Sequence, residues 1–181
     1  IRSNPIPYQQ MVTQTILGIM RSLNVYMPNY ILPYQNRGVI DVMLPVIARY
    51  QENYLGVTER FIYDLATNLK HHTNLMLTWK IIDFDRFPLD HLYTNDLPRY
   101  SLWWWYDRLS KYLLKRPQAY FEHILRKFDA KLIHAHFGPN GIQMLPLKRR
   151  LRIPLITSFH GYDYVGIPRL KGDPRMYMEL F

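Results

Sequence analysis

Three histidines in two neighbouring segments of the chain could bind a metal or a ligand. His134 and His136 lie in "LIHAHF", and His160 lies in "TSFHGYD". Side chains two residues apart on a strand point to one face of the sheet, so His134 and His136 should lie together. The three imidazoles could hold zinc. The chain has no cysteine, however, and no carboxylate stands near them at ligand spacing, so we expect no metal site.

Two alternatives remain for the histidine pair. A strand that is buried on both faces accommodates neutral histidines that hydrogen-bond to the backbone. Otherwise the pair binds a ligand, and His136 is then the better placed of the two, because it is nearer the end of the strand.

Each histidine segment continues into a turn that contains glycine. Gly138 and Gly141 bracket a Gly-Pro-Asn-Gly turn, where the N–H groups that begin a helix could bind an anion. This turn has neither the lysine of a phosphate-binding loop nor the three glycines of a dinucleotide fingerprint. The second turn, "HGYD", joins His160 to Gly161, which permits close backbone approach, and to the acid Asp163. It indicates a ligand site more specifically, and an ordinary turn is its alternative.

Hydrophobic periodicity predicts alternating strands and helices from residue 39 onward. Thr58 is the expected N-cap of the first helix. The expected strands are 39–50, interrupted at Pro45, 74–82, 131–137 and 154–159; the expected helices are 57–72, 100–128 with a break at Pro117, 140–150 and a last one that begins at Asp173, and 83–99 is expected to be a loop.

This alternation predicts an α/β fold, a Rossmann-like parallel sheet with helices on both faces. Ligands bind such sheets at the carboxyl ends of the strands, where both glycine turns would lie. The residues expected to be buried in the last two strands are Ile133, Phe137, Leu155, Ile156 and Phe159.

The segment "LIHAHFGPNGIQMLPLKRRLRIPLITSFHGYD" resembles the N-terminal half of the family 4 glycosyltransferases. That family has a His-x-His-Phe strand, a glycine turn, a helix, an Ile-Pro pair and a strand ending in Thr/Ser-x-His-Gly-x-Asp. Each part is present here, with Ile153 and Pro154 as the pair. "GVTERFIYDLATNL", residues 56–69, resembles the family's first loop and helix more weakly. The resemblance covers residues 39–181 and implies the N-terminal half of a GT-B fold.

The resemblance also implies an activity. It is the transfer of a hexose from a nucleotide-sugar donor to a glycan or lipid-linked acceptor, with retained anomeric configuration, in cell-surface polysaccharide biosynthesis. The nucleotide sugar is a co-substrate, and no metal or other cofactor is implied. His160 matches the histidine that lies against the donor sugar and is the expected catalytic residue. The expected donor- or acceptor-binding residues are Thr58, in the loop near the donor phosphates, His136, Gly138, Gly141, Gly161, which gives backbone room, and Asp163, which orients its loop.

The chain departs from the family at both ends. Residues 1–38 match nothing in the family, and we expect an extension with a short amphipathic helix ahead of a glycosyltransferase domain at 39–181. A poorly ordered extension is the alternative for residues 1–38. The family's donor-binding Glu-x7-Glu motif is missing, because no two glutamates have that spacing before the chain ends at Phe181. We therefore expect a truncated acceptor-side domain that is inactive as a fragment.

Charge and aromatic content bear on the partners of the chain. The net charge of +9 suggests an anionic partner. Segment 103–116 interleaves tryptophan and tyrosine with lysine and arginine, which suits peripheral contact with an anionic membrane at the inner face of the cell membrane, and hence a cytoplasmic protein. The alternative is a helix packed on the sheet with a basic outer face.

A non-catalytic basic α/β module that binds a phosphorylated ligand or nucleic acid is the alternative function. The aromatic motif of RNA-recognition domains is missing from the sequence, so no nucleic acid is expected.

Overall fold

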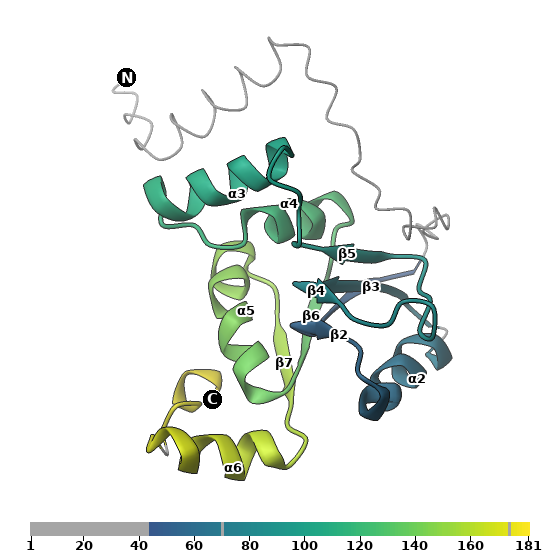
Figure 1. Ribbon diagram of the computed structural model, residues 1–181, viewed down its shortest axis with the longest axis vertical. Helices are drawn as coiled ribbons and strands as arrows, with labels where there is room; N and C mark the ends of the chain where they lie inside the picture. Colours follow the sequence, from purple (N-terminus) through teal and green to yellow (C-terminus); the bar gives the residue numbers. More distant parts are fainter. Residues whose placement is uncertain (1–43, 70, 174) are drawn as a thin grey trace, which may run out of the picture.

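The computed structural model describes residues 44–69, 71–173 and 175–181 of the chain. These residues form a central sheet with helices packed around it (Figure 1). The elements are, in chain order, β1 Val46–Tyr50, β2 Asn53–Tyr54, the 3-10 helix η1 Val57–Glu59, α2 Arg60–Asn68, β3 Thr73–Thr78, β4 Lys80–Ile81, β5 Leu92–Thr94, α3 Leu102–Leu113, α4 Ala119–Lys127, β6 Leu132–His136, α5 Gly138–Leu151, β7 Leu155–Ser158, α6 Tyr162–Lys171 and the 3-10 helix η2 Met178–Leu180. The helix expected within residues 1–38 lies outside the described residues.

The five main strands form one parallel sheet in the order β5-β3-β1-β6-β7. Ile133 of β6 pairs with Leu155 of β7, and His136 pairs with Ser158, in parallel register. All four neighbouring strand pairs of this sheet are parallel, which confirms the predicted Rossmann-like α/β class. Strands β2 and β4 form a separate two-stranded parallel pair.

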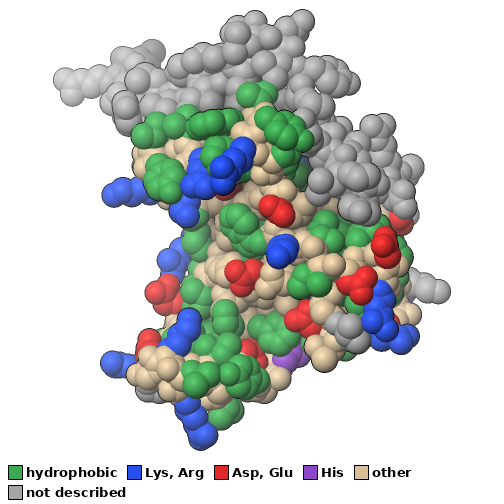
Figure 2. All heavy atoms as spheres, in the orientation of Figure 1, with side chains coloured by type: hydrophobic (Ala, Val, Ile, Leu, Met, Phe, Trp, Pro, Cys, Tyr) green, Lys and Arg blue, Asp and Glu red, His purple; other side chains and the backbone are tan. Residues whose placement is uncertain are grey.

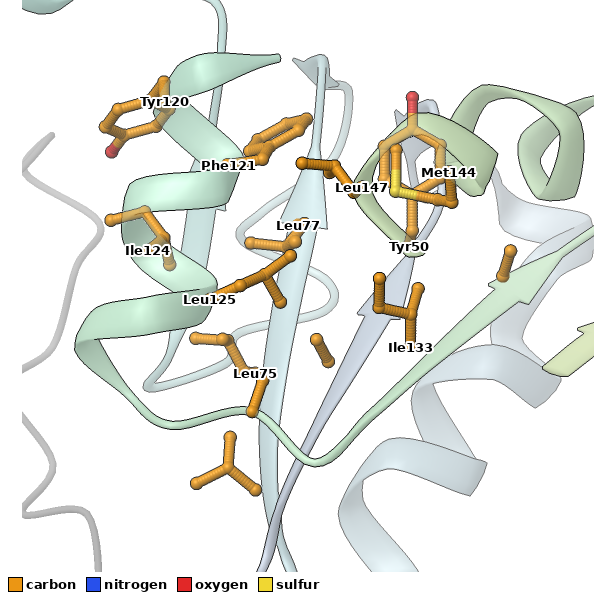
Figure 3. Close-up of a cluster of buried hydrophobic side chains, with 14 of the residues drawn as sticks. Tyr50, Leu75, Leu77, Tyr120, Phe121, Ile124, Leu125, Ile133, Met144 and Leu147 are labelled. Carbon is orange, nitrogen blue, oxygen red and sulfur yellow. The ribbon is translucent and has the colours of Figure 1, made fainter. Parts of the chain in front are cut away.

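Helices cover both faces of the sheet, as predicted. On one face, Phe121 and Leu125 of α4 and Met144 of α5 pack over strand side chains that include Leu75 and Ile133 (Figure 3). On the other face, Ile62 of α2 packs in a second cluster with Met76 and Leu92. Alternate residues of β3 therefore enter opposite cores, as the period-2 geometry of a strand requires.

Burial in the last two strands agrees only in part with the expectation. Ile133 is fully buried, and Phe137, Leu155 and Phe159 are half-buried. Ile156, expected to be buried, is 51% exposed. Ile156 lies on the edge strand β7, on the same face of the sheet as its neighbour His134. Ile62 of α2 does not cover it, because Ile62 packs over other strands, in a cluster with Met76 and Leu92. The uniformly apolar pattern of a central strand was therefore the wrong template for β7.

Three expected features of the elements are corrected. Segment 83–99 is not entirely loop, since it contains β5, which is three residues long. The last α-helix is α6, which ends at Lys171, before the expected start at Asp173. Thr58 is not an N-cap: the Glu59 side chain instead accepts a hydrogen bond from the backbone N–H of Gly56, at 2.8 Å.

The break between α3 and α4 falls near Pro117, as expected. Among the described residues, no helix combines the length and the apolar composition that crossing a membrane requires.

Candidate functional site at the carboxyl edge of the sheet

The predicted histidines meet at the carboxyl ends of β6 and β7. His136 is the last residue of β6, and His160 follows the end of β7 by two residues. The His134 and His136 rings lie 4.4 Å apart between centroids, and the His136 and His160 rings stack at 5.7 Å. The strand spacing therefore brings all three imidazoles together, as the sequence indicated.

His160 is exposed, yet its ring is held among aromatic neighbours. The Phe61 ring of α2 lies 4.7 Å from it, and the Phe137 ring lies 4.6 Å from it, both between centroids. The side chain thus faces solvent at the sheet edge in a restricted orientation. Phe61 was not among the expected site residues, although its place in the first helix of the family-like segment could have suggested it.

A buried arginine fixes the protonation of His134. Arg49 is 2% exposed; its Nε donates to Asn74 Oδ1 at 2.7 Å, and its Nη1 lies 2.9 Å from His134 Nδ1. Because a guanidinium can only donate, Nδ1 of His134 accepts and carries no proton. The proton of a neutral His134 is therefore on Nε2, which lies 2.8 Å from the Ser158 hydroxyl.

The surroundings keep both strand histidines neutral. Burial, followed by the charges of Arg49 and His160, lowers the pKa of His134 to about 4. Burial, followed by the neighbouring His134 and Arg49, lowers the pKa of His136 to about 3. Removing an imidazolium from water is costly in itself, and a fixed cation nearby adds to that cost.

His136 has polar atoms without partners. The residue is 1% exposed, and neither ring nitrogen makes a hydrogen bond within the described part of the chain. His134, by contrast, bonds to side chains and not to the backbone, so neither histidine matches the backbone-bonded alternative. A buried unsatisfied imidazole costs free energy, and it marks His136 as a position where a bound water or ligand atom would be stabilising.

Asp163 joins the two glycine turns. Its Oδ1 accepts from the backbone N–H of His160 at 2.8 Å, and its Oδ2 accepts from the backbone N–H of Gly138 at 2.7 Å. The residue is 2% exposed, and its own carbonyl accepts from the Tyr177 hydroxyl at 2.8 Å. One carboxylate in the first turn of α6 therefore fixes the positions of both strand-end turns relative to each other.

A second polar chain runs from β6 to the first loop. Asn140 Nδ2 donates to the His136 carbonyl at 2.6 Å and to Gln51 Oε1 at 2.8 Å. Gln51 Nε2 donates in turn to Glu59 Oε1 at 3.0 Å, and Glu59 binds the Gly56 backbone. Gln51 and Glu59 were not expected at the site. They hold the Gly56–Glu59 loop, which includes the exposed Thr58, against the sheet edge.

The glycines serve different physical purposes. A Cβ on Gly138 would come within 2.6 Å of the Phe159 and Tyr177 rings, and one on Gly141 would overlap the Thr157 side chain, so both positions require close packing. Gly161 has a φ of +87° and open space beside it, so its requirement is conformational. Ligand binding by these three residues and by Thr58 stays a prediction.

No group of three or more histidine, cysteine, aspartate or glutamate side chains is arranged to hold a metal ion in residues 44–69, 71–173 and 175–181. The absence of a metal from the reaction stays a prediction.

The carboxyl edge of the sheet offers one exposed imidazole, a buried neutral imidazole behind it and two turns tied together by Asp163. These groups can hydrogen-bond a polyhydroxylated ligand.

The geometry agrees with what a comparison of the sequence with protein families finds. A family model described as "Glycosyltransferase Family 4" matches residues 58–180, more than half of the chain. The match runs from η1 to the end of η2 and includes both glycine turns. No curated protein and no solved structure gives a significant match. With a parallel sheet of this class and a family match of this length, the chain belongs to glycosyltransferase family 4.

Proposed function

We propose that this chain is the acceptor-side domain of a retaining glycosyltransferase. The enzyme would move a hexose from a nucleotide-sugar donor to a glycan or lipid-linked acceptor in cell-surface polysaccharide synthesis. The observation that carries the proposal is the setting of His160, which is exposed at the carboxyl edge of the sheet while Asp163 holds its backbone. In open α/β sheets, ligands bind at this edge.

In the proposed reaction, the bond between the anomeric carbon and the nucleotide phosphate breaks, and the acceptor oxygen forms its bond on the same face of the sugar. The phosphate leaves with the bonding electrons, and its oxygen takes up the proton that the acceptor hydroxyl loses. His160 would hydrogen-bond a donor-sugar hydroxyl as positive charge develops at the anomeric carbon, in the manner of preorganised electrostatic stabilisation. Phe61 and Phe137 would keep the imidazole oriented and partly shielded from water.

The buried groups behind His160 would have a positioning role. Arg49 and His134 form a rigid hydrogen-bonded unit with Asn74 and Ser158, and His136 stacks between this unit and His160. Because His136 stays neutral, it adds no charge that would repel a cationic transition state.

The experiment that tests the proposal is a transfer assay on the complete gene product that contains these 181 residues. His160→Ala should lower the transfer rate roughly 30- to 1000-fold, the loss expected for one stabilising hydrogen bond of about 2–4 kcal/mol. The matched control is His71→Ala, since His71 is exposed and lies just before β3, at the opposite edge of the sheet. A folded His160→Ala protein with nearly full activity would show that His160 is structural.

We also propose that α3 contacts an anionic membrane, where a lipid-linked acceptor would reside. Its exposed apolar side chains are Trp105, Leu109, Tyr112 and Leu113, whose three- and four-residue spacings put them on one side of the helix. The acidic residue of α3, Asp107, is buried, while Arg108 and Lys111 flank the apolar stripe. Figure 2 shows lysine and arginine side chains gathered among hydrophobic ones over this helix. Aromatic and basic side chains in this arrangement suit the surface of anionic lipids.

Co-sedimentation with vesicles tests the membrane contact. The wild-type chain should bind vesicles of phosphatidylglycerol and phosphatidylcholine more strongly than vesicles of phosphatidylcholine alone. The double variant Trp105→Ser, Leu113→Ser should lose most of this binding, whereas Ile82→Ser, at an exposed apolar residue outside α3, should keep it. Equal binding by the three proteins would rule out α3 as the contact. Equal binding to both vesicle types would rule out a preference for anionic lipid.

A further inference from the structure

A cavity lies at the same carboxyl edge of the sheet, away from the histidines. It has a volume of about 190 Å³ and lies between α3 and the ends of two neighbouring strands. Trp79 directly follows β3 and Asn95 directly follows β5, and the backbone N–H of Asn95 donates to the Thr78 carbonyl at 2.9 Å. Its remaining lining residues are Leu97, Trp104, Asp107, Arg108 and Lys111.

The α3 side of the cavity comes from one face of the helix. Trp104, Asp107, Arg108 and Lys111 follow one another at helical spacings of three, one and three residues. This face differs from the apolar stripe that contains Trp105 and Leu109. A single helix therefore presents one surface to the cavity and another to solvent.

One buried polar atom of a residue that lines the cavity lacks a partner. Asn95 is 6% exposed, and its Nδ2 makes no hydrogen bond within the described residues. Buried amide donors are nearly always paired, with protein, water or ligand. Asn95 lines the cavity although its Nδ2 is closed to solvent, so a rotation of the amide group would bring this unpaired donor to an acceptor atom placed there.

The other walls indicate which ligand would fit. Trp79 and Trp104 supply indole rings, on which the apolar face of a sugar ring can pack. The Arg108 guanidinium lies 4.6 Å from the Trp104 ring centroid, and Lys111 adds a second cation. Asp107 is held in place by the Tyr120 backbone N–H, which donates to its Oδ1 at 3.1 Å. Two cations against one carboxylate leave the wall with a net positive charge, which favours an anionic group on the ligand.

We propose that this cavity binds an anionic pyranose, a sugar ring that carries a carboxylate or a phosphate group, as a subsite for the acceptor. The inference rests on the proposed function, because it names the chemistry of the acceptor side. The ring would pack on the indoles, a ring oxygen or hydroxyl would accept from Asn95 Nδ2, and the anionic group would lie toward Arg108 and Lys111. The position of the cavity on the ligand-binding edge of the sheet agrees with this role.

Titration of tryptophan fluorescence tests the proposal on the 181-residue chain. The probes are glucuronate, glucose 6-phosphate and glucose, so that carboxylate, phosphate and neutral ligands are compared. Glucuronate or glucose 6-phosphate should bind saturably with a dissociation constant on the order of 1 mM, as ordinary ligand efficiency gives for a molecule of this size. Glucose should bind at least about fivefold more weakly, because it lacks the charge that Lys111 and Arg108 would attract.

Two variants in the cavity and one control outside it test which residues bind the ligand. Lys111→Gln should weaken binding of the anionic sugar about tenfold, whereas Lys115→Gln, at a lysine that is also exposed but lies outside the cavity, should not change it. Asn95→Leu should abolish binding without lowering the melting temperature, since the variant removes an unpaired donor. A structural asparagine would show the opposite pattern, with lost stability.

The proposal is overturned if no anionic sugar binds to the folded chain, if glucose binds as tightly as the anionic sugars, or if both lysine variants behave alike. These outcomes are distinct from failure of the proposed function. A chain that binds the anionic sugars as described, within a gene product that transfers no sugar, would support the cavity and refute the enzyme. An active enzyme without this binding would refute the cavity alone.

Discussion

Replacing Asp163 by asparagine should destabilise the fold and release the two turns that form the candidate site. The carboxylate accepts from two backbone N–H groups, those of His160 and Gly138, at 2.8 and 2.7 Å. Asparagine has the same size, but only its Oδ1 can accept, so one of the two backbone N–H groups would keep its hydrogen bond. The other N–H would face the NH2 group of the asparagine, and neither of these two donors would have an acceptor. A hydrogen bond to a charged group contributes about 1.5–3 kcal/mol. We therefore expect Asp163→Asn to cost roughly that much.

For a domain of this size, such a loss lowers the melting temperature by roughly 3–12 °C. Calorimetry or urea denaturation of the chain measures the change directly. The matched control is Asp173→Asn, because Asp173 is exposed and its Oδ1 accepts from one backbone N–H, that of Arg175, at 3.0 Å. The reasoning is refuted if Asp163→Asn and Asp173→Asn are both as stable as the wild type.

Three further predictions concern the stability of the chain. The lowered pKa values of His134 and His136, about 4 and about 3, mean that the unfolded chain binds more protons below its histidine pKa of about 6.5. The free energy of unfolding should therefore fall by roughly 1.5–2 kcal/mol per pH unit from pH 6.5 to 4, after discounting the half-buried His134 for screening, and urea titrations of His136→Leu should show a shallower fall. Burial raises the pKa of the Glu122 carboxyl, but Arg116, Arg150 and Arg126 outweigh it and lower the pKa overall, so this network should add stability that is lost at still lower pH. Glu122→Gln should cost roughly 2–4 kcal/mol in chemical denaturation, while Asp129→Asn, in an exposed pair with Lys131, should leave the midpoint unchanged. Gly141→Ala should destabilise through overlap with Thr157, and Thr157→Ala should restore much of the loss in a double-mutant cycle; additive effects would contradict this packing.

The sequence predicted the parts of the site that depend on local pattern. Alternation along a strand put His134 and His136 on one face, and the order of strands and helices placed both glycine turns at one edge. The groups that sequence reasoning missed have partners far along the chain. Arg49 lies within an otherwise apolar strand, and its partners Asn74 and His134 come from two other strands.

The errors in the elements have local causes. Strand β5 has three residues, fewer than periodicity can reveal, and it forms because β3 offers an edge. Helix α6 contains Gly166 and Pro168, and no element was predicted for this segment from the sequence. It forms nonetheless, with Asp163 accepting from the His160 backbone at its start and Pro168 buried. Asp173 carries the signals of an N-cap, but Gly172 before it ends a helix in the left-handed conformation.

The central claim is that His160 takes part in sugar transfer at this edge. The most direct test follows the anomeric configuration and the rate of transfer by the complete gene product, using proton NMR of the product. The account predicts a product with the anomeric configuration of the donor, a rate roughly 30- to 1000-fold lower for His160→Ala, and an unchanged rate for His71→Ala. A product of inverted configuration would contradict the retaining mechanism, and a folded His160→Ala enzyme with the wild-type rate would contradict the assignment of the site.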